Sequence, residues 1–132
     1  MRALIITNYF PPEIGAASNR IFLMAKNLNL KFNHVEVVCP FPNYPSGKIF
    51  GNYKGLYKKE VVENIFCHRL FIYPDNSSSP VKRLLSMLSF AVSIWILIFK
   101  IIPKNYDQII IQNSPVLVSC SSIILFKKIF NK

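Results

Sequence analysis

The segment from Ala3 to Leu28 constrains the fold of this chain more than any other part. A short apolar run, Ala3–Thr7, precedes a loop that contains proline and glycine, and apolar residues then recur at helical spacing up to Leu28. This order is typical of the first strand, loop and helix of a parallel α/β sheet. Such sheets bind ligands at the carboxyl ends of their strands, beside helix N-termini with free N–H groups. We therefore expect the binding surface to begin in this segment.

The residues of this first loop favour a turn that faces a ligand. Pro11–Pro12 cannot continue the strand, whereas Gly15 permits unusual backbone angles and close approach of a ligand. Ser18 or Asn19 is the predicted N-cap, because either side chain can accept hydrogen bonds from the first helical turn. Arg20 falls in or near that turn, where a cation is unfavourable, so it is either solvated or faces an anionic ligand.

The excess of basic over acidic residues indicates that the partners of the chain are polyanions. Its 132 residues, of which 52% are hydrophobic, suffice for one domain with a buried core. Sixteen Lys and Arg residues oppose six Asp and Glu residues, a net charge of +10. This surplus favours nucleic acid, anionic lipid headgroups or phosphorylated substrates as partners, without choosing among them.

The cysteine and histidine residues of the chain do not have the sequence spacing that is typical of a metal-binding site. Cys39, Cys67 and Cys120 each lie in an apolar run, which predicts buried free thiols in a reducing compartment. His34 and His68 are isolated from other ligand-type residues, so we predict neither a metal site nor a bound cofactor. The N-terminal apolar stretch is too short for a signal-peptide core, which favours the cytoplasm.

The remainder of the chain continues the alternation of strands and helices that an α/β fold requires. Two adjacent apolar runs around Glu63-Asn64 predict an antiparallel hairpin. The predicted elements after the first helix are a strand at His34–Cys39, a long loop at Phe41–Gly55, hairpin strands at Leu56–Val62 and Ile65–Tyr73, an exposed linker at Pro74–Pro80, a helix at Lys82–Lys100, a strand at Tyr106–Gln112, a loop at Asn113–Pro115 and a helix at Val116–Phe130.

The first of the two later helices has no charge between its ends. Its uncharged stretch rises only ~24 Å, less than the ~30 Å of a bilayer core. Three environments remain open for it: a domain core, a transmembrane span, or a position between the sheet and a membrane surface. In the last case Trp95 and Phe99 contact lipid, and Lys82, Arg83 and Lys100 reach the headgroups.

Several of these segments together resemble the N-terminal domain of bacterial family-four glycosyltransferases. The likeness is strongest to the subgroup that adds N-acetylfucosamine-type sugars during O-antigen or capsule synthesis. The residues that carry it are Tyr9–Arg20 and Phe41–Ile49, with further likeness at Tyr57–Glu60, Lys82–Leu85 and Asn113–Pro115.

The resemblance implies one lobe of a GT-B architecture, in which two Rossmann-like domains face each other across a cleft. This lobe would hold mainly the acceptor, a lipid diphosphate-linked sugar at the inner membrane face, while the other lobe holds the nucleotide-sugar donor. Gly15 and Ala16 would lie near the donor diphosphate, although Ala16 departs from the second glycine of many relatives. The acceptor side would be lined by Arg20, Asn43, Tyr44, Lys48, Asn113 and Ser114.

The chain departs from the family pattern in its extent. It stops at Lys132, and no segment matches the E-x7-E carboxylates of the family's C-terminal domain. None of the six acidic residues forms an acid/base pair by sequence. We therefore expect an amino-terminal half from a truncated or split gene, inactive alone and with a separate C-terminal half as a possible partner.

Two other function classes are open from the sequence. Aromatic and basic residues interleave as in a single-strand stacking platform, although no nucleic-acid recognition module is visible and no nucleic acid is expected. The residues concerned are Phe41, Tyr44, Phe50, Tyr53 and Tyr57, with Lys48, Lys54, Lys58 and Lys59. The other class is a non-catalytic membrane-associated protein, the remnant of an enzyme.

Overall fold

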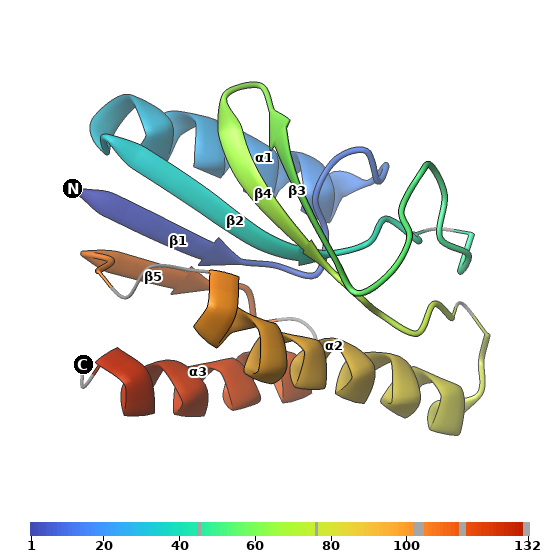
Figure 1. Ribbon diagram of the computed structural model, residues 1–132. Helices are drawn as coiled ribbons and strands as arrows, with labels where there is room; N and C mark the ends of the chain where they lie inside the picture. Colours follow the sequence, from blue (N-terminus) through green and yellow to red (C-terminus); the bar gives the residue numbers. More distant parts are fainter. Residues whose placement is uncertain (45, 76, 102–104, 114–115, 131–132) are drawn as a thin grey trace.

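The chain folds into an α/β structure with a five-stranded mixed sheet between helices (Figure 1). The computed structural model describes residues 1–44, 46–75, 77–101, 105–113 and 116–130. Its elements are β1 (Arg2–Ile6), α1 (Ala16–Lys31), β2 (His34–Pro40), β3 (Tyr57–Val62), β4 (Ile65–Leu70), α2 (Pro80–Ile101), β5 (Gln108–Ile111) and α3 (Val116–Phe130).

The strands lie in the order β3-β4-β2-β1-β5, with only β3 antiparallel to its neighbour. The order of the four parallel strands is compatible with a Rossmann-like fold. The predicted hairpin is confirmed, because Glu63 and Asn64 both have positive φ, as a two-residue type I′ turn requires. The predicted α/β fold, a parallel sheet flanked by helices with a hairpin, is confirmed in its coarse form; the sheet is mixed, because both hairpin strands join it and β3 runs antiparallel to β4.

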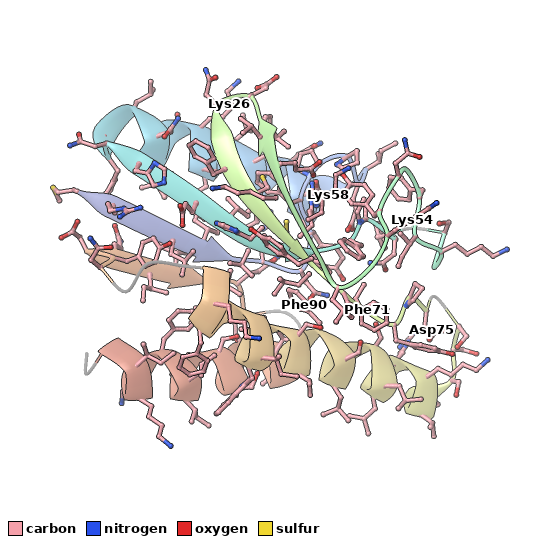
Figure 2. The ribbon with its side chains drawn as sticks, in the orientation of Figure 1. Lys26, Lys54, Lys58, Phe71, Asp75 and Phe90 are labelled. Carbon is pink, nitrogen blue, oxygen red and sulfur yellow. The ribbon has the colours of Figure 1, made fainter. Side chains whose placement is uncertain are left out.

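Helices cover both faces of the sheet, with α1 on one face and α2 and α3 on the other (Figure 1). Side chains alternate along the strands, so Ile5 and Val37 pack toward α1 while Leu4 and Val38 pack toward α2 and α3. Figure 2 shows Phe90 of α2 between that helix and the sheet, and its side chain is fully buried. The fold therefore has two separate apolar cores.

Some of the predicted boundaries and exposures need correction. Helix α1 begins at Ala16, with Gly15 as its N-cap, and not after Ser18. No side-chain hydrogen bond caps this end of the helix. Arg20 consequently begins the second turn. Among the cysteines, Cys39 and Cys67 are buried free thiols as predicted.

Cys120 is exposed on α3, contrary to the expectation of a buried thiol. The predicted strands Ile65–Tyr73 and Tyr106–Gln112 are longer than the observed ones. Their extra apolar residues, such as Ile72 and Tyr106, are buried in the core without pairing in the sheet.

One buried carboxylate joins β2 to β4 and to the segment that precedes β5. Glu36 of β2 points to the α2 and α3 side, where its side chain is only 5% exposed. His34 Nε2 lies 2.8 Å from Oε1, Tyr106 donates its hydroxyl to Oε2, and His68 Nε2 lies 3.5 Å from Oε2. Burial alone would raise the pKa of Glu36, but the hydrogen bonds from His68, Tyr106 and His34 outweigh it and lower the pKa to about 2.

We expect Glu36→Gln to reduce stability in a pH-dependent way. Because the folded pKa of about 2 lies below the ordinary 4.5, the carboxylate stabilises the fold fully above pH 4.5 and loses this effect as the pH falls toward 2. The free energy of unfolding in urea should therefore drop by about 3 kcal/mol at neutral pH, and by much less near pH 2. Glu63→Gln, at an exposed turn position, is the matched control. A deficit that stays constant across this range would contradict the assignment.

Candidate functional site

Most of the long loops of the chain lie at one edge of the sheet, where the four parallel strands have their carboxyl ends. The segments that follow β1, β2 and β4 lie on the right of Figure 1. At this edge the chain passes from β1 to α1 on one face, and from β5 to α3 on the other. Ligands bind in α/β sheets where neighbouring strands diverge in this way. This edge is therefore the candidate site.

Polar side chains occupy the point where β1 and β5 diverge. Thr7 donates its hydroxyl to Gln112 Oε1, and the backbone N–H of Asn8 donates to the same oxygen at 3.2 Å. Asn113 Oδ1 accepts from Ser119 Oγ at 2.9 Å, so α3 fixes this side chain. The predicted site residue Asn113 thus lies at the divergence point, and Ser114 lies outside the described residues.

The two segments that carry the family resemblance meet at this edge. The rings of Tyr9 and Tyr44 pack edge to face with centroids 5.5 Å apart. Gly15 has φ 154° and ψ 164°, a combination open essentially to glycine alone. A Cβ at Gly15 would lie 3.4 Å from the Tyr44 ring. The predicted residues Gly15 and Tyr44 are therefore brought together, although they are far apart in the sequence.

Arg69 is the buried cation that holds these segments in place. Its side chain is fully buried and donates to Glu60 Oε1 at 2.6 Å, to the Pro40 carbonyl at 3.4 Å, and to the Pro11 carbonyl. The guanidinium lies 5.8 Å from the ring centroid of Phe10. Sequence reasoning missed Arg69, because a single arginine in a strand gives no local sign of burial.

Glu13 is a second site residue that sequence reasoning missed. Its side chain lies in the loop between β1 and α1 and is buried, and neither carboxylate oxygen has a hydrogen-bond partner among the described residues. Burial raises the pKa of Glu13 to about 8, despite the opposing influence of the Asn43 and Tyr44 backbone amides and of Arg69. A perturbed carboxyl at a candidate site is a sign of function that only the fold reveals.

The other predicted site residues differ in how far they join this arrangement. Asn43 is half-buried and donates from Nδ2 to the Phe41 carbonyl at 2.8 Å. Ala16, Arg20 and Lys48 are exposed, and neither cation forms an ion pair within the part of the chain that the structure describes. Arg20 borders a groove that runs along α1 to Lys31.

The surface of α2 is strongly apolar. A groove of about 410 Å³ lies beside it, bordered on its other side by Leu56 and Phe71. Figure 2 shows Phe71 next to α2, on the side of the carboxyl edge. Among the side chains of this helix that the structure describes, the exposed large apolar ones are Val81, Leu84, Leu85, Leu88, Val92, Trp95, Ile96 and Phe99.

The predicted membrane-contact residues of α2 are all accessible. Trp95 is 37% exposed and Phe99 52% exposed. Lys82, Arg83 and Lys100 are exposed as well, and they lie at the two ends of the helix. Among the described residues, no helix combines the length and the hydropathy that crossing a bilayer would need.

Four of the five aromatic residues that suggested a stacking platform for nucleic acid, Phe41, Tyr44, Tyr53 and Tyr57, have ring contacts within the protein. Phe41 is 1% exposed and packs on Tyr53, whose hydroxyl donates to Glu60 at 2.8 Å. Tyr57 stacks on His68 and is hydrogen-bonded to its Nδ1 at 2.9 Å. These contacts join the rings to the sheet and its long loop.

Two further findings concern cofactors and relatives. In the described ranges, no three His, Cys, Asp or Glu side chains converge in a way that could hold a metal ion. Comparison with protein-family models, with curated proteins and with solved structures gives no match to this chain.

We expect Arg69→Met to destabilise the protein by about 3–5 kcal/mol, the usual cost of removing one partner from a buried ion pair. The change leaves the Glu60 carboxylate without its guanidinium and two carbonyls without a donor. Urea unfolding measures the loss. Arg83→Met, which alters an exposed arginine, is the control and should cost little. Equal stability of the two variants would show that Arg69 does not hold the edge together.

Proposed function

We propose that this chain is the acceptor-side lobe of a GT-B glycosyltransferase that modifies a lipid-linked glycan during surface polysaccharide synthesis. In the complete enzyme a nucleotide-sugar donor would be held largely by an opposing C-terminal lobe. A lone lobe contacts the donor from one side only, so we expect the isolated chain to bind ligand without transferring sugar. Its place in the cell would be the cytoplasmic surface of the inner membrane.

The observation that carries this proposal is the meeting of two distant segments at one edge of the sheet. The resemblance rests on Tyr9–Arg20 and Phe41–Ile49, and these segments contact each other through Tyr9, Gly15 and Tyr44. Segments that merely share a chance composition have no reason to be joined at the carboxyl edge of a parallel sheet, where α/β proteins bind ligands. The Rossmann-compatible strand order supports the same interpretation.

The donor diphosphate would lie at the N-terminus of α1. Gly15 caps this helix without a side chain, so the N–H groups of the first turn remain open to an anion. The charge of the leaving diphosphate would be stabilised by these N–H groups and by cations. Ala16 begins the helix, and its small exposed side chain leaves room for close approach.

The surface of α2 supports a membrane role for the same lobe. Exposed apolar side chains along the helix, with cations at both ends, match a helix that lies at an anionic membrane interface. Such a contact would bring the carboxyl edge of the sheet close to a lipid-linked acceptor. The proposed location at the membrane surface and the proposed lipid-linked acceptor thus both depend on the exposed apolar surface of α2.

We expect the chain to bind a short-chain prenyl diphosphate N-acetylglucosamine, used as the acceptor probe, at the carboxyl edge. Tyr44→Ala should weaken binding at least tenfold, about 1.4 kcal/mol. Tyr44→Phe keeps the ring contact with Tyr9 and tests the hydroxyl alone. Calorimetric titration measures the affinity, with Leu30→Ala at the exposed end of α1 as control. The proposal fails if the probe does not bind, or if it binds all variants equally.

We also expect the chain to float with vesicles that contain phosphatidylglycerol. Changing Trp95 and Phe99 together to Lys should reduce vesicle binding at least tenfold, because two apolar side chains leave the lipid. Added lysines increase attraction to anionic lipid, so a loss of binding reports the apolar contact itself. The matched control changes Leu23 and Leu30 of α1, which are also exposed, to Lys. Unchanged flotation of the α2 variant would exclude this membrane surface.

A further inference from the structure

The Glu13 carboxyl is an exception among the buried polar groups of the candidate site. Its side chain is buried, yet both oxygens lack a hydrogen-bond partner within the part of the chain that the structure describes. Native proteins pair the large majority of buried polar side-chain atoms, and each exception calls for an explanation. A carboxyl tolerates such a site far better when it is neutral than when it is charged.

Glu13 lies where the loop after β1 meets the loop after β2. The backbone amides of Asn43 and Tyr44 are near enough to its carboxylate to favour the charged form in part. The cation Arg69 is also near, but its hydrogen bonds go to Glu60, to the Pro11 carbonyl and to the Pro40 carbonyl, and the Glu13 oxygens accept none among the described residues. The charged form of Glu13 therefore has incomplete compensation where it lies.

We propose that the proton on Glu13 controls the position of the loop that carries Asn43 and Tyr44. With the carboxyl neutral, the two loops pack together as observed. When the proton passes to water, the carboxylate moves toward solvent and the Asn43–Tyr44 backbone separates from the β1–α1 loop.

The contacts of this loop favour such a movement as a unit. Gly47 N donates to the Asn43 carbonyl at 2.7 Å, and Phe50 N donates to the Pro42 carbonyl at 3.0 Å. These hydrogen bonds lie within the loop and survive its displacement. Toward the β1–α1 loop, Tyr44 contributes the edge-to-face contact with Tyr9, which is weak compared with the penalty of a buried charge.

Three groups near Glu13, the side chains of Tyr9, Cys39 and Arg69, keep their protonation state up to pH 9. Burial raises the pKa of Tyr9 above 10 and that of Cys39 to about 11, and Arg69 stays protonated. Glu60 faces Arg69 and accepts hydrogen bonds from that guanidinium and from the Tyr53 hydroxyl. The pKa of Glu13 is raised to about 8 with the loop closed, and opening returns it toward 4.5, so the observed midpoint falls between these values.

This inference does not depend on the proposed transferase function. It concerns the geometry of the loop and holds for any ligand that the carboxyl edge binds. For the proposed acceptor it adds that Asn43 and Tyr44 are in place only while Glu13 is protonated.

The experiment follows the backbone amides of Asn43 and Tyr44 by NMR in the full chain between pH 4 and 9. We expect both signals to shift with one midpoint between about 5 and 8. Above this midpoint the hydrogen-exchange rates of the two amides should increase with pH more steeply than base catalysis alone would make them. Glu13→Gln mimics the neutral carboxyl and should remove the midpoint while keeping the loop protected throughout. Glu63→Gln, at an exposed turn, should leave the midpoint unchanged.

A second measurement keeps the inference testable if Glu13→Gln does not fold. The side-chain carboxyl carbon of Glu13 in the unaltered chain reports its protonation directly. A midpoint near 4.5, the ordinary value for glutamate, would overturn the inference. A raised midpoint without any change at Asn43 and Tyr44 would overturn it as well, because the carboxyl would then titrate without moving the loop.

Discussion

The buried guanidinium of Arg69 is the interaction on which the candidate site depends. It joins the edge strand β3 through Glu60, the end of β2 through Pro40, and the loop after β1 through Pro11. A charge that is fully buried is tolerated only with several good partners, so all of these groups must be in place at once. The antiparallel hairpin is therefore part of the site's framework, because it supplies Glu60 and Arg69 from adjacent strands. An arginine suits this position because its planar fork serves several acceptors, which a lysine cannot.

Two buried glutamates on opposite faces of the sheet show how environment decides the role of a side chain. Glu36 has hydrogen-bonding partners on neighbouring strands, and its pKa falls to about 2. Glu13 is buried without hydrogen-bond donors to its carboxylate oxygens among the described residues, and its pKa rises to about 8. The first carboxylate joins β2 to β4 and to the segment that precedes β5, and is permanently charged at neutral pH. The second lies at the carboxyl edge, in the loop between β1 and α1. The structural carboxylate of Glu36 and the candidate functional carboxyl of Glu13 thus lie in different parts of the fold.

The elements that local patterns specify were predictable from the sequence, whereas the features that depend on distant contacts were not. Apolar periodicity and the Glu63-Asn64 turn determine the hairpin and the later helices within a few residues. The start of α1 was misplaced, because Gly15 caps it through backbone conformation and not through a side chain. The burial of Arg69 and Glu13 was missed, because their surroundings come from strands and loops far away in the sequence. The contact between Gly15 and Tyr44 was not predicted, because no local signal relates the two loops.

The apolar groove beside α2 connects the membrane role to the candidate site. Two serines line it, yet Ser93 donates to the Phe71 carbonyl at 2.8 Å and Ser89 donates to the Ser86 carbonyl at 2.7 Å. With these hydroxyls engaged, the lining presents hydrocarbon to whatever enters. Leu56 ends the long loop after β2, and Phe71 follows β4, so the groove begins at the carboxyl edge of the sheet. An amphiphile with its polar end at that edge would extend its chain along α2. This is the shape that the proposed lipid-linked acceptor has, and it explains why one lobe would carry both surfaces.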